Sequence, residues 1–237
     1  PWFPETAAAA AADPALDLGV HLTLNAEKQW YRWGPVTAPS ASAGLTDPDG
    51  YLWRKVADVR AHAHPEAVEA EWRAQIERAL AAGIDVTHLD AHMGSALAPE
   101  FCDRYIALGV EYGLPVLIPA ALSSYGPRKH LAGVTDAAFD AFVVAARRVG
   151  MPVFDRVLET DFGRATGDTA DYQTMLSSAG GELVYCAFHP CAPGTGEIAT
   201  IEPSTHHVRV DEYELFRTGA WSGWLEAQPF EVIGMRG

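Results

Sequence analysis

The sequence has little cysteine, a small share of basic residues and no long apolar run. Its 237 residues include three cysteines, and 17 Lys and Arg stand against 31 Asp and Glu, for a formal net charge of −14. No run of about 18 or more apolar residues occurs, so no membrane-spanning helix is predicted. Nucleic acid, whose binding needs clustered Lys and Arg, is excluded as a partner. A polyanionic substrate is disfavoured for the same reason, which leaves a neutral molecule or a metal cation.

The three cysteines, Cys102, Cys186 and Cys191, are odd in number and lack the spacing of a metal site or a disulfide framework. We therefore expect reduced thiols in a cytoplasmic protein. A hydrophobic content of 49% with 20% charged residues is ordinary for a globular chain. The length fits a single domain over residues 1–237.

Strand-like and helix-like patterns alternate along most of the chain. Residues 16–24 alternate apolar and polar side chains, and residues 64–83 keep the helical spacing of Val68, Trp72, Ile76 and Leu80. Further helices are predicted at 4–12, 99–113, 136–150, 167–181 and 211–219, and further strands at 84–92, 114–120, 152–158, 182–190 and 230–235. Such repeated βα units predict an α/β fold with parallel strands, as a barrel or an open sheet.

One long segment, at about 25–64, shows no sustained period and is rich in Pro, Gly, Ser and aromatic residues. A loop of this length within a compact domain is usually functional, as a lid or a binding loop. We therefore predict that this segment contributes to a site.

The stretch "THLDAHMG" at 87–94 places His88, Asp90 and His92 at every second position. On a strand these side chains share one face, where they are poor core material. Imidazole and carboxylate groups suit Zn²⁺ and other divalent cations, and Asp90 could orient a ligand histidine.

Two further histidines, His21 and His189, lie late in a predicted strand or just past one. Catalytic groups of parallel α/β folds collect at the carboxyl ends of strands, so His21, His92 and His189 are predicted to share one site. His189 precedes a turn rich in Pro and Gly, where an imidazole is placed to transfer a proton. His62, His64, His206 and His207 are instead expected to be solvated.

The segments "DLGVHLTLN", "AEWRAQIERALAAGIDVTHLDAHMG" and "VYCAFHP", in this order, resemble the YdjC-like carbohydrate deacetylase family, of the chitooligosaccharide deacetylase type. The "RVDEYELF" segment is similar to the family's closing helix. The resemblance implies a distorted TIM-like (β/α) barrel that binds one divalent metal ion, Mg²⁺ or Zn²⁺, and removes acetyl groups from N-acetylated sugars.

The resemblance also assigns residues. His21 and His92 match the family's metal-ligand histidines, and His189 matches its general acid. Asp90 is placed among the catalytic groups. Trp30, Trp33 and His88 are expected to bind the sugar, although the aromatic segment at 30–35 could equally cover the mouth of the barrel as a hydrophobic plug. No nucleic acid or membrane partner is expected, and a homodimer is compatible with the sequence.

Two departures from the family pattern stand out. The family's first strand ends in an Asp-Asp pair that supplies a metal ligand and a general base, and this sequence has no equivalent. Either the given sequence lacks the first βαβ unit of the barrel, which we favour because its loss would expose a sheet edge, or the pair has been lost. Cys191 stands where the family has a glycine.

Other functions stay open beside a deacetylase. One is a different metal-dependent amidohydrolase on a β/α barrel, for which "HAH" at 62–64 has the required His-x-His spacing. The other is a non-catalytic sugar-binding or metal-binding homologue. If His21 and His92 do share one ion, their imidazoles must face each other within about 7 Å, given metal–nitrogen bonds of about 2.0–2.2 Å.

Overall fold

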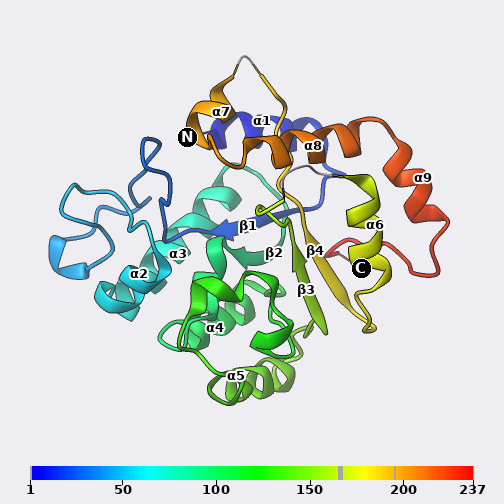
Figure 1. Ribbon diagram of the computed structural model, residues 1–237. Helices are drawn as coiled ribbons and strands as arrows, with labels where there is room; N and C mark the ends of the chain where they lie inside the picture. The colour runs from blue at the N-terminus through cyan, green and yellow to red at the C-terminus, as the bar shows by residue number, and fades with distance from the viewer. Residues whose placement is uncertain (1, 165–167, 195, 237) are drawn as a thin grey trace.

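Short parallel strands form the frame of the protein, seen in the ribbon view of this computed structural model (Figure 1). The structure describes residues 2–164, 168–194 and 196–236. The strands are β1 (Leu18–Leu22), β2 (Val86–Ala91), β3 (Arg156–Glu159) and β4 (Val184–Ala187). β1 pairs with β2 and β3 pairs with β4, both in parallel. The α/β fold with parallel strands is therefore confirmed.

The two strand pairs are joined through the segment that was predicted as a strand at 114–120. Parallel bridges link Leu89 to Val116 and Pro119 to Phe154, so the segment lies between β2 and the start of β3. It forms isolated bridges instead of a full strand because Pro115 and Pro119 have no N–H to donate to a ladder. The parallel segments thus follow one another in chain order, and closure into a barrel stays a prediction.

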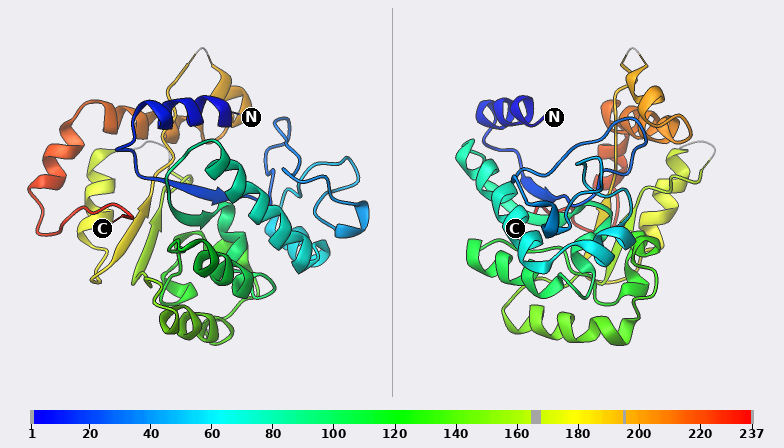
Figure 2. Two further views of the ribbon diagram at one scale, coloured as in Figure 1. Left: turned by 180° about the vertical axis from the view of Figure 1, so that it is seen from behind. Right: turned by 90° about the vertical axis from the view of Figure 1, so that its left-hand side faces the viewer.

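Helices surround this frame. They are α1 (Phe3–Ala12), α2 (Val56–His62), α3 (Pro65–Ala81), α4 (Cys102–Tyr112), α5 (Asp136–Arg148), α6 (Thr169–Ser177), α7 (Glu197–Ile201), α8 (His206–Arg217) and α9 (Ala220–Glu226). Figures 1 and 2 show α1 and α8 at one end of the molecule and α5 at the opposite end. No helix in the described part of the chain combines the length and the apolar character needed to cross a membrane.

Helix α3 illustrates how sequence pattern and packing agree. Pro65 opens the helix, and Gly83, just past its end, has a positive φ of 79° that a glycine adopts without strain. Trp72 and Ile76 are fully buried against the strands. Leu80, which we predicted on the same face, is instead 42% exposed, and Ala79 takes the buried position near the end of the helix.

Three further predictions differ from the structure. The segment 25–64 is not loop throughout, because it contains α2 and a short 3-10 helix, Ala41–Ala43. Residues 230–235 lie outside every described strand, and the backbone N–H of Met235 donates to Asp17 instead of to a ladder. His206 and His207, which we expected to be solvated, begin α8 and are half-buried.

All three cysteines are free thiols, as expected, while the cytoplasmic location stays a prediction.

A buried carboxylate on α3 anchors the long segment 25–64. Glu71 is fully buried, and its two oxygens accept hydrogen bonds from the backbone N–H groups of Val36 (2.7 Å) and Thr37 (2.9 Å). The neighbouring Gln75 donates to Glu71 and also bonds both backbone groups of Thr23, just after β1. The helix therefore fixes the segment and the end of β1 together.

We expect Glu71→Ala to lower the free energy of unfolding by about 3 kcal/mol, because several buried donors lose their acceptor. Urea denaturation would measure this loss. Glu66→Ala on the same helix, where the side chain is 76% exposed, should cost about 1 kcal/mol or less. Equal losses in the two variants would contradict the anchoring role of Glu71.

Candidate metal centre and proton-transfer site

Two imidazoles meet at the carboxyl ends of β1 and β2. His21 lies within β1 opposite Asp90 of β2, and His92 begins the 3-10 segment that follows β2. His21 Nε2 and His92 Nδ1 are 3.3 Å apart, and the ring centroids are 5.3 Å apart. The structure therefore brings the two predicted ligands together with one ring nitrogen facing the other, within the expected limit.

The chain turns sharply just after His92, and this turn aims its ring. Met93 and Gly94 both have left-handed backbone conformations, with φ of 53° and 66°. Such a conformation is strained for Met93 and persists only where the surrounding structure holds it. A side chain at Gly94 would also collide with Tyr125, because a Cβ there would lie 2.5 Å from the tyrosine hydroxyl oxygen. The glycine of "HMG" therefore serves the geometry of His92.

Each imidazole is held from behind by a carboxylate. His21 Nδ1 lies 2.9 Å from an Asp90 oxygen, and His92 Nε2 lies 2.8 Å from a Glu27 oxygen. Burial alone would raise the pKa of Asp90, but the charge and hydrogen bond of His21 outweigh burial and lower it. Asp90 is thus committed to orienting His21, as its position beside a ligand histidine predicted.

These outer bonds decide which ring nitrogens carry protons. If both rings are neutral and donate to their carboxylates, His21 Nε2 and His92 Nδ1 face each other with two lone pairs and no proton between them. A cation between the two nitrogens removes that repulsion. Two nitrogens bound tetrahedrally at about 2.0–2.1 Å are about 3.4 Å apart, which the 3.3 Å separation matches. The pair therefore fits two ligands of one divalent ion.

His21 and His92 would supply two protein ligands to a metal ion. Within the described ranges, no group of three or more His, Cys, Asp or Glu side chains is arranged to hold a metal ion. The remaining coordination positions would be open to water, to substrate or to another ligand.

His189, just past β4, is held on a second polar cluster. Its Nδ1 lies 2.8 Å from the hydroxyl of Thr160, which itself donates to the buried carboxylate of Glu212 at 2.7 Å. Glu212 also accepts from the hydroxyl of Tyr172 and from the backbone N–H of His189. Because Thr160 has one proton and gives it to Glu212, His189 Nδ1 must be the donor to Thr160. The neutral ring then has its lone pair on Nε2.

The surroundings of His189 disfavour its charged form. Burial is the main cause, followed by the charges of Arg209, His21 and His92, and together they lower the pKa of His189 to about 4. His189 is therefore a neutral imidazole near pH 7. That His189 shares one site with His21 and His92 stays a prediction.

The comparisons with known proteins identify the family of this chain. A family described as "YdjC-like protein" matches residues 1–227. The chain belongs to the YdjC-like family. The resemblance to this family inferred from the three sequence segments is confirmed, while the chitooligosaccharide deacetylase type stays a prediction.

Similar curated proteins are named carbohydrate deacetylase. One, from Thermus thermophilus, is 39% identical over 117 residues, which cover 46% of this chain and 40% of the relative. Another, from Brevibacillus brevis, is 30% identical over 173 residues, which cover 73% of this chain and 62% of the relative. The matches thus span about two fifths and three fifths of these relatives.

A solved structure shares the fold. It is described as a candidate cellobiose-phosphate cleavage protein from Enterococcus faecalis V583. The TM-score is 0.73 at 21% identity, and the match covers 99% of this chain and 83% of the other.

The residues predicted to bind sugar lie in different surroundings. Trp33 is near the pair, with its ring centroid 6.4 Å from that of His92, and Trp30 is 84% exposed. His88 lies further back on β2, where it bonds Thr87 and covers Gly19 so closely that no side chain would fit there. Sugar binding by these three residues stays a prediction.

The "HAH" spacing does not form a metal site. The His62 ring stacks on Trp53 at 4.3 Å, and its Nδ1 lies 2.8 Å from the backbone oxygen of Asp58. His62 therefore has a structural role that accounts for its position, which removes the support for the amidohydrolase hypothesis.

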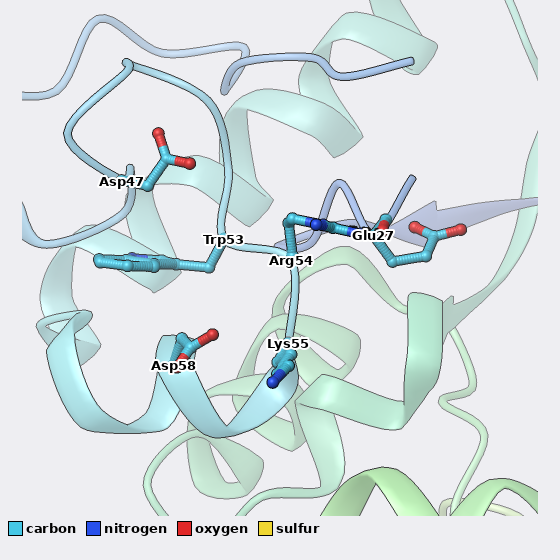
Figure 3. Close-up of a pocket in the computed structure, with 6 residues that line it drawn as sticks. All are labelled: Glu27, Asp47, Trp53, Arg54, Lys55 and Asp58. Carbon is cyan, nitrogen blue, oxygen red and sulfur yellow. Dashed lines mark hydrogen bonds between the residues drawn. The ribbon is translucent and has the colours of Figure 1, made fainter. Parts of the chain in front are cut away.

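A pocket of about 350 Å³ adjoins the imidazole pair. Its lining residues are Glu27, Asp47, Trp53, Arg54, Lys55 and Asp58. Figure 3 shows the Trp53 indole between Asp47 and Asp58, with Arg54 extending toward Glu27. Because Glu27 both lines this pocket and bonds His92, the pocket is next to the candidate metal centre.

Sequence reasoning missed the residues that hold the histidines. Glu27 lies in a segment without periodicity, and Thr160 follows a strand that contains no known motif. No sequence pattern therefore marks either residue as part of a site. Glu212 and Arg209 belong to the "RVDEYELF" segment, which was noted only for its resemblance.

We expect the His189 ring to carry its proton on Nδ1 and to stay neutral down to about pH 4. ¹⁵N NMR, assigned by comparison with His189→Gln, would show both properties. The folded pKa lies below the unfolded value near 6.5, so protonation favours the unfolded state. Stability should therefore be lost as pH falls from about 6.5 to about 4, and more steeply in the wild type than in His189→Gln. Titration of His189 at or above pH 6.5 would contradict this environment.

Proposed function

We propose that this chain removes acetyl groups from N-acetylated sugars, with one divalent ion held by His21 and His92. The observation that carries the proposal is the facing pair of imidazole nitrogens, each ring backed by its own carboxylate. Membership of the YdjC-like family, and relatives named carbohydrate deacetylase, support the choice of reaction.

The nature of the ligands bears on the choice of metal. Imidazole nitrogen suits Zn²⁺ and other transition ions better than Mg²⁺, which prefers oxygen ligands. We therefore favour Zn²⁺ over Mg²⁺. When bound, such an ion would polarise the acetyl carbonyl and lower the pKa of a bound water.

His189 is proposed to move the proton. As a neutral imidazole with its lone pair on Nε2, it can accept a proton from the attacking water. The same Nε2–H can then donate that proton to the nitrogen of the departing amine, which leaves as a neutral amine. The family resemblance predicted a general acid at this position, and the low pKa of His189 adds that the proton must be gained during the reaction.

The sugar is proposed to lie against Trp33 and in the pocket beside Glu27. Trp33 is the aromatic ring of the segment 30–35 that contacts His92. The pocket adds an indole with acidic and basic groups around it, a combination that suits a neutral molecule rich in hydroxyls.

A non-catalytic metal-binding protein is the second candidate function. It is favoured by the observation that the described residues supply only two ligands at this centre. The two functions differ in whether the loaded protein turns over an N-acetyl sugar.

We expect this chain to bind Zn²⁺ in calorimetric titration, and to lose both Zn²⁺ binding and deacetylation in His21→Ala and His92→Ala. Removal of the metal by a chelator should abolish turnover, and added Zn²⁺ should restore it. His64→Ala, an exposed histidine near the start of α3, is the matched control and should behave as the wild type. Turnover that survives complete removal of metal would exclude the proposed chemistry.

We expect His189→Ala to lower kcat for an N-acetyl sugar by about 10²–10⁴-fold while metal content stays unchanged. The loss should be smaller for an O-acetyl ester, because its leaving group needs less protonation than an amine. The measurements are kcat for both substrates, metal content and melting temperature on the same samples. Loss of metal in this variant would make His189 a ligand, and equal losses on both substrates with a lower melting temperature would indicate a structural role.

A further inference from the structure

A chain of alternating charges runs away from His92 on the side opposite His21. The second oxygen of Glu27 lies 3.2 Å from Lys28 Nζ, and the same ammonium pairs with Glu202. Glu202, at the end of α7, accepts a hydrogen bond from Arg209 Nε of α8 at 2.9 Å and forms an ion pair with Arg209 Nη2 at 2.8 Å. Residues distant in sequence are thus linked in the order Glu27, Lys28, Glu202, Arg209.

The members of this chain are not ordinary surface ion pairs. Glu202 has a side chain only 5% exposed and also accepts from the hydroxyl of Thr205. Burial alone would raise its pKa, but the bonds from Arg209 and Lys28 lower it to about 2. A carboxylate this deeply buried stays ionised only when its charge is paired. Removal of Lys28 or Arg209 would therefore destabilise the remaining ion pairs.

The far end of the chain reaches the segment of His189. Arg209 donates a hydrogen bond to the backbone oxygen of His189 at 3.3 Å. Its guanidinium also lies over the ring of Phe162 at 4.9 Å, and that ring contacts the His189 imidazole with centroids 5.0 Å apart. One series of contacts therefore connects the metal-facing imidazole with the proton-transferring imidazole.

We infer that Glu27 is a positioning residue for His92, held in place by the Lys28–Glu202–Arg209 chain. Its carboxylate keeps the proton of His92 on Nε2, so that Nδ1 faces His21 with a free lone pair. The chain fixes the first residues of the segment 25–64 to α8, and so fixes the imidazole pair relative to His189. This role deepens the proposed function and rests on it.

The role follows from the geometry of the pair. Without Glu27, the His92 ring would lose the partner that selects its tautomer, and a proton on Nδ1 would point at His21 Nε2, where the cation is proposed to lie. Groups that orient a ligand histidine in this way typically contribute about 10–100-fold to metal affinity. Glu27 would not itself contact substrate atoms that react.

The first experiment measures Zn²⁺ affinity by calorimetry in Glu27→Ala and Glu27→Gln. We expect affinity about 10–100-fold weaker in Glu27→Ala. The loss should be smaller in Glu27→Gln, because the amide oxygen can still accept from His92 Nε2–H. Glu100→Gln is the control, since Glu100 forms an ion pair with Arg60 away from the imidazole pair, and it should match the wild type. Wild-type affinity in Glu27→Ala would overturn the inference.

A second measurement works without metal and separates this inference from the proposed function. In the metal-free wild type, ¹⁵N NMR should show His92 protonated on Nε2, and Glu27→Ala should shift it toward Nδ1. An unchanged tautomer in a variant that melts at the wild-type temperature would overturn the positioning role. A wild type that shows the predicted tautomer but binds no Zn²⁺ would instead overturn the proposed function.

Lys28→Met tests the chain that holds Glu27. The variant keeps an aliphatic stem of similar length but removes the cation between Glu27 and Glu202. We expect an intermediate loss of Zn²⁺ affinity, smaller than in Glu27→Ala, because Glu27 keeps its bond to His92 but loses its support. Zn²⁺ affinity equal to that of the wild type would show that the chain does not hold Glu27.

Discussion

The hydrogen bonds that hold the two imidazoles from behind are the constraint on which the candidate site depends. The Asp90 carboxylate lies against His21 Nδ1 and the Glu27 carboxylate lies against His92 Nε2, so His21 Nε2 and His92 Nδ1 face each other at 3.3 Å. If both rings are neutral and donate to these carboxylates, the two facing nitrogens carry lone pairs that repel, and a shared cation would remove that repulsion. The electrostatics of the site therefore depend on the protonation states of four side chains, which are His21, His92, Asp90 and Glu27.

The surrounding fold positions His21, His92 and their two carboxylates. The parallel pairing of β1 and β2 sets His21 opposite Asp90. The left-handed turn at Met93 aims the ring of His92. The buried carboxylate of Glu71 fixes both the end of β1, through Gln75, and the segment that carries Glu27. Each of these is a polar or strained feature whose cost is offset by apolar packing around Trp72 and Leu89.

His189 is held in a different way from the imidazole pair. His189 has no carboxylate on its ring, only a hydroxyl that is itself committed to Glu212. Burial and the nearby cation of Arg209 then favour the neutral imidazole. Carboxylates thus lie against the rings of His21 and His92, whereas burial and Arg209 favour the neutral form of His189. This division suits a reaction in which a proton is taken up and released within one cycle.

The sequence alone determined the alternation of strands and helices, the family, and the histidines worth attention. Those features are local: a strand is visible as alternation, α3 as a helical repeat from Val68 to Ile76, and His21, His92 and His189 by their place after apolar runs. The tertiary structure decided the partners. Glu27 and Glu212 come from segments 65 and 23 residues away from the histidines that they bond, and no periodicity in the sequence encodes such a separation. The structure also decided that residues 230–235 do not form a strand, because the backbone N–H of Met235 donates to the side chain of Asp17. Local pattern reflects the backbone's own preferences, whereas the protonation state of a histidine depends on what the whole fold brings next to it.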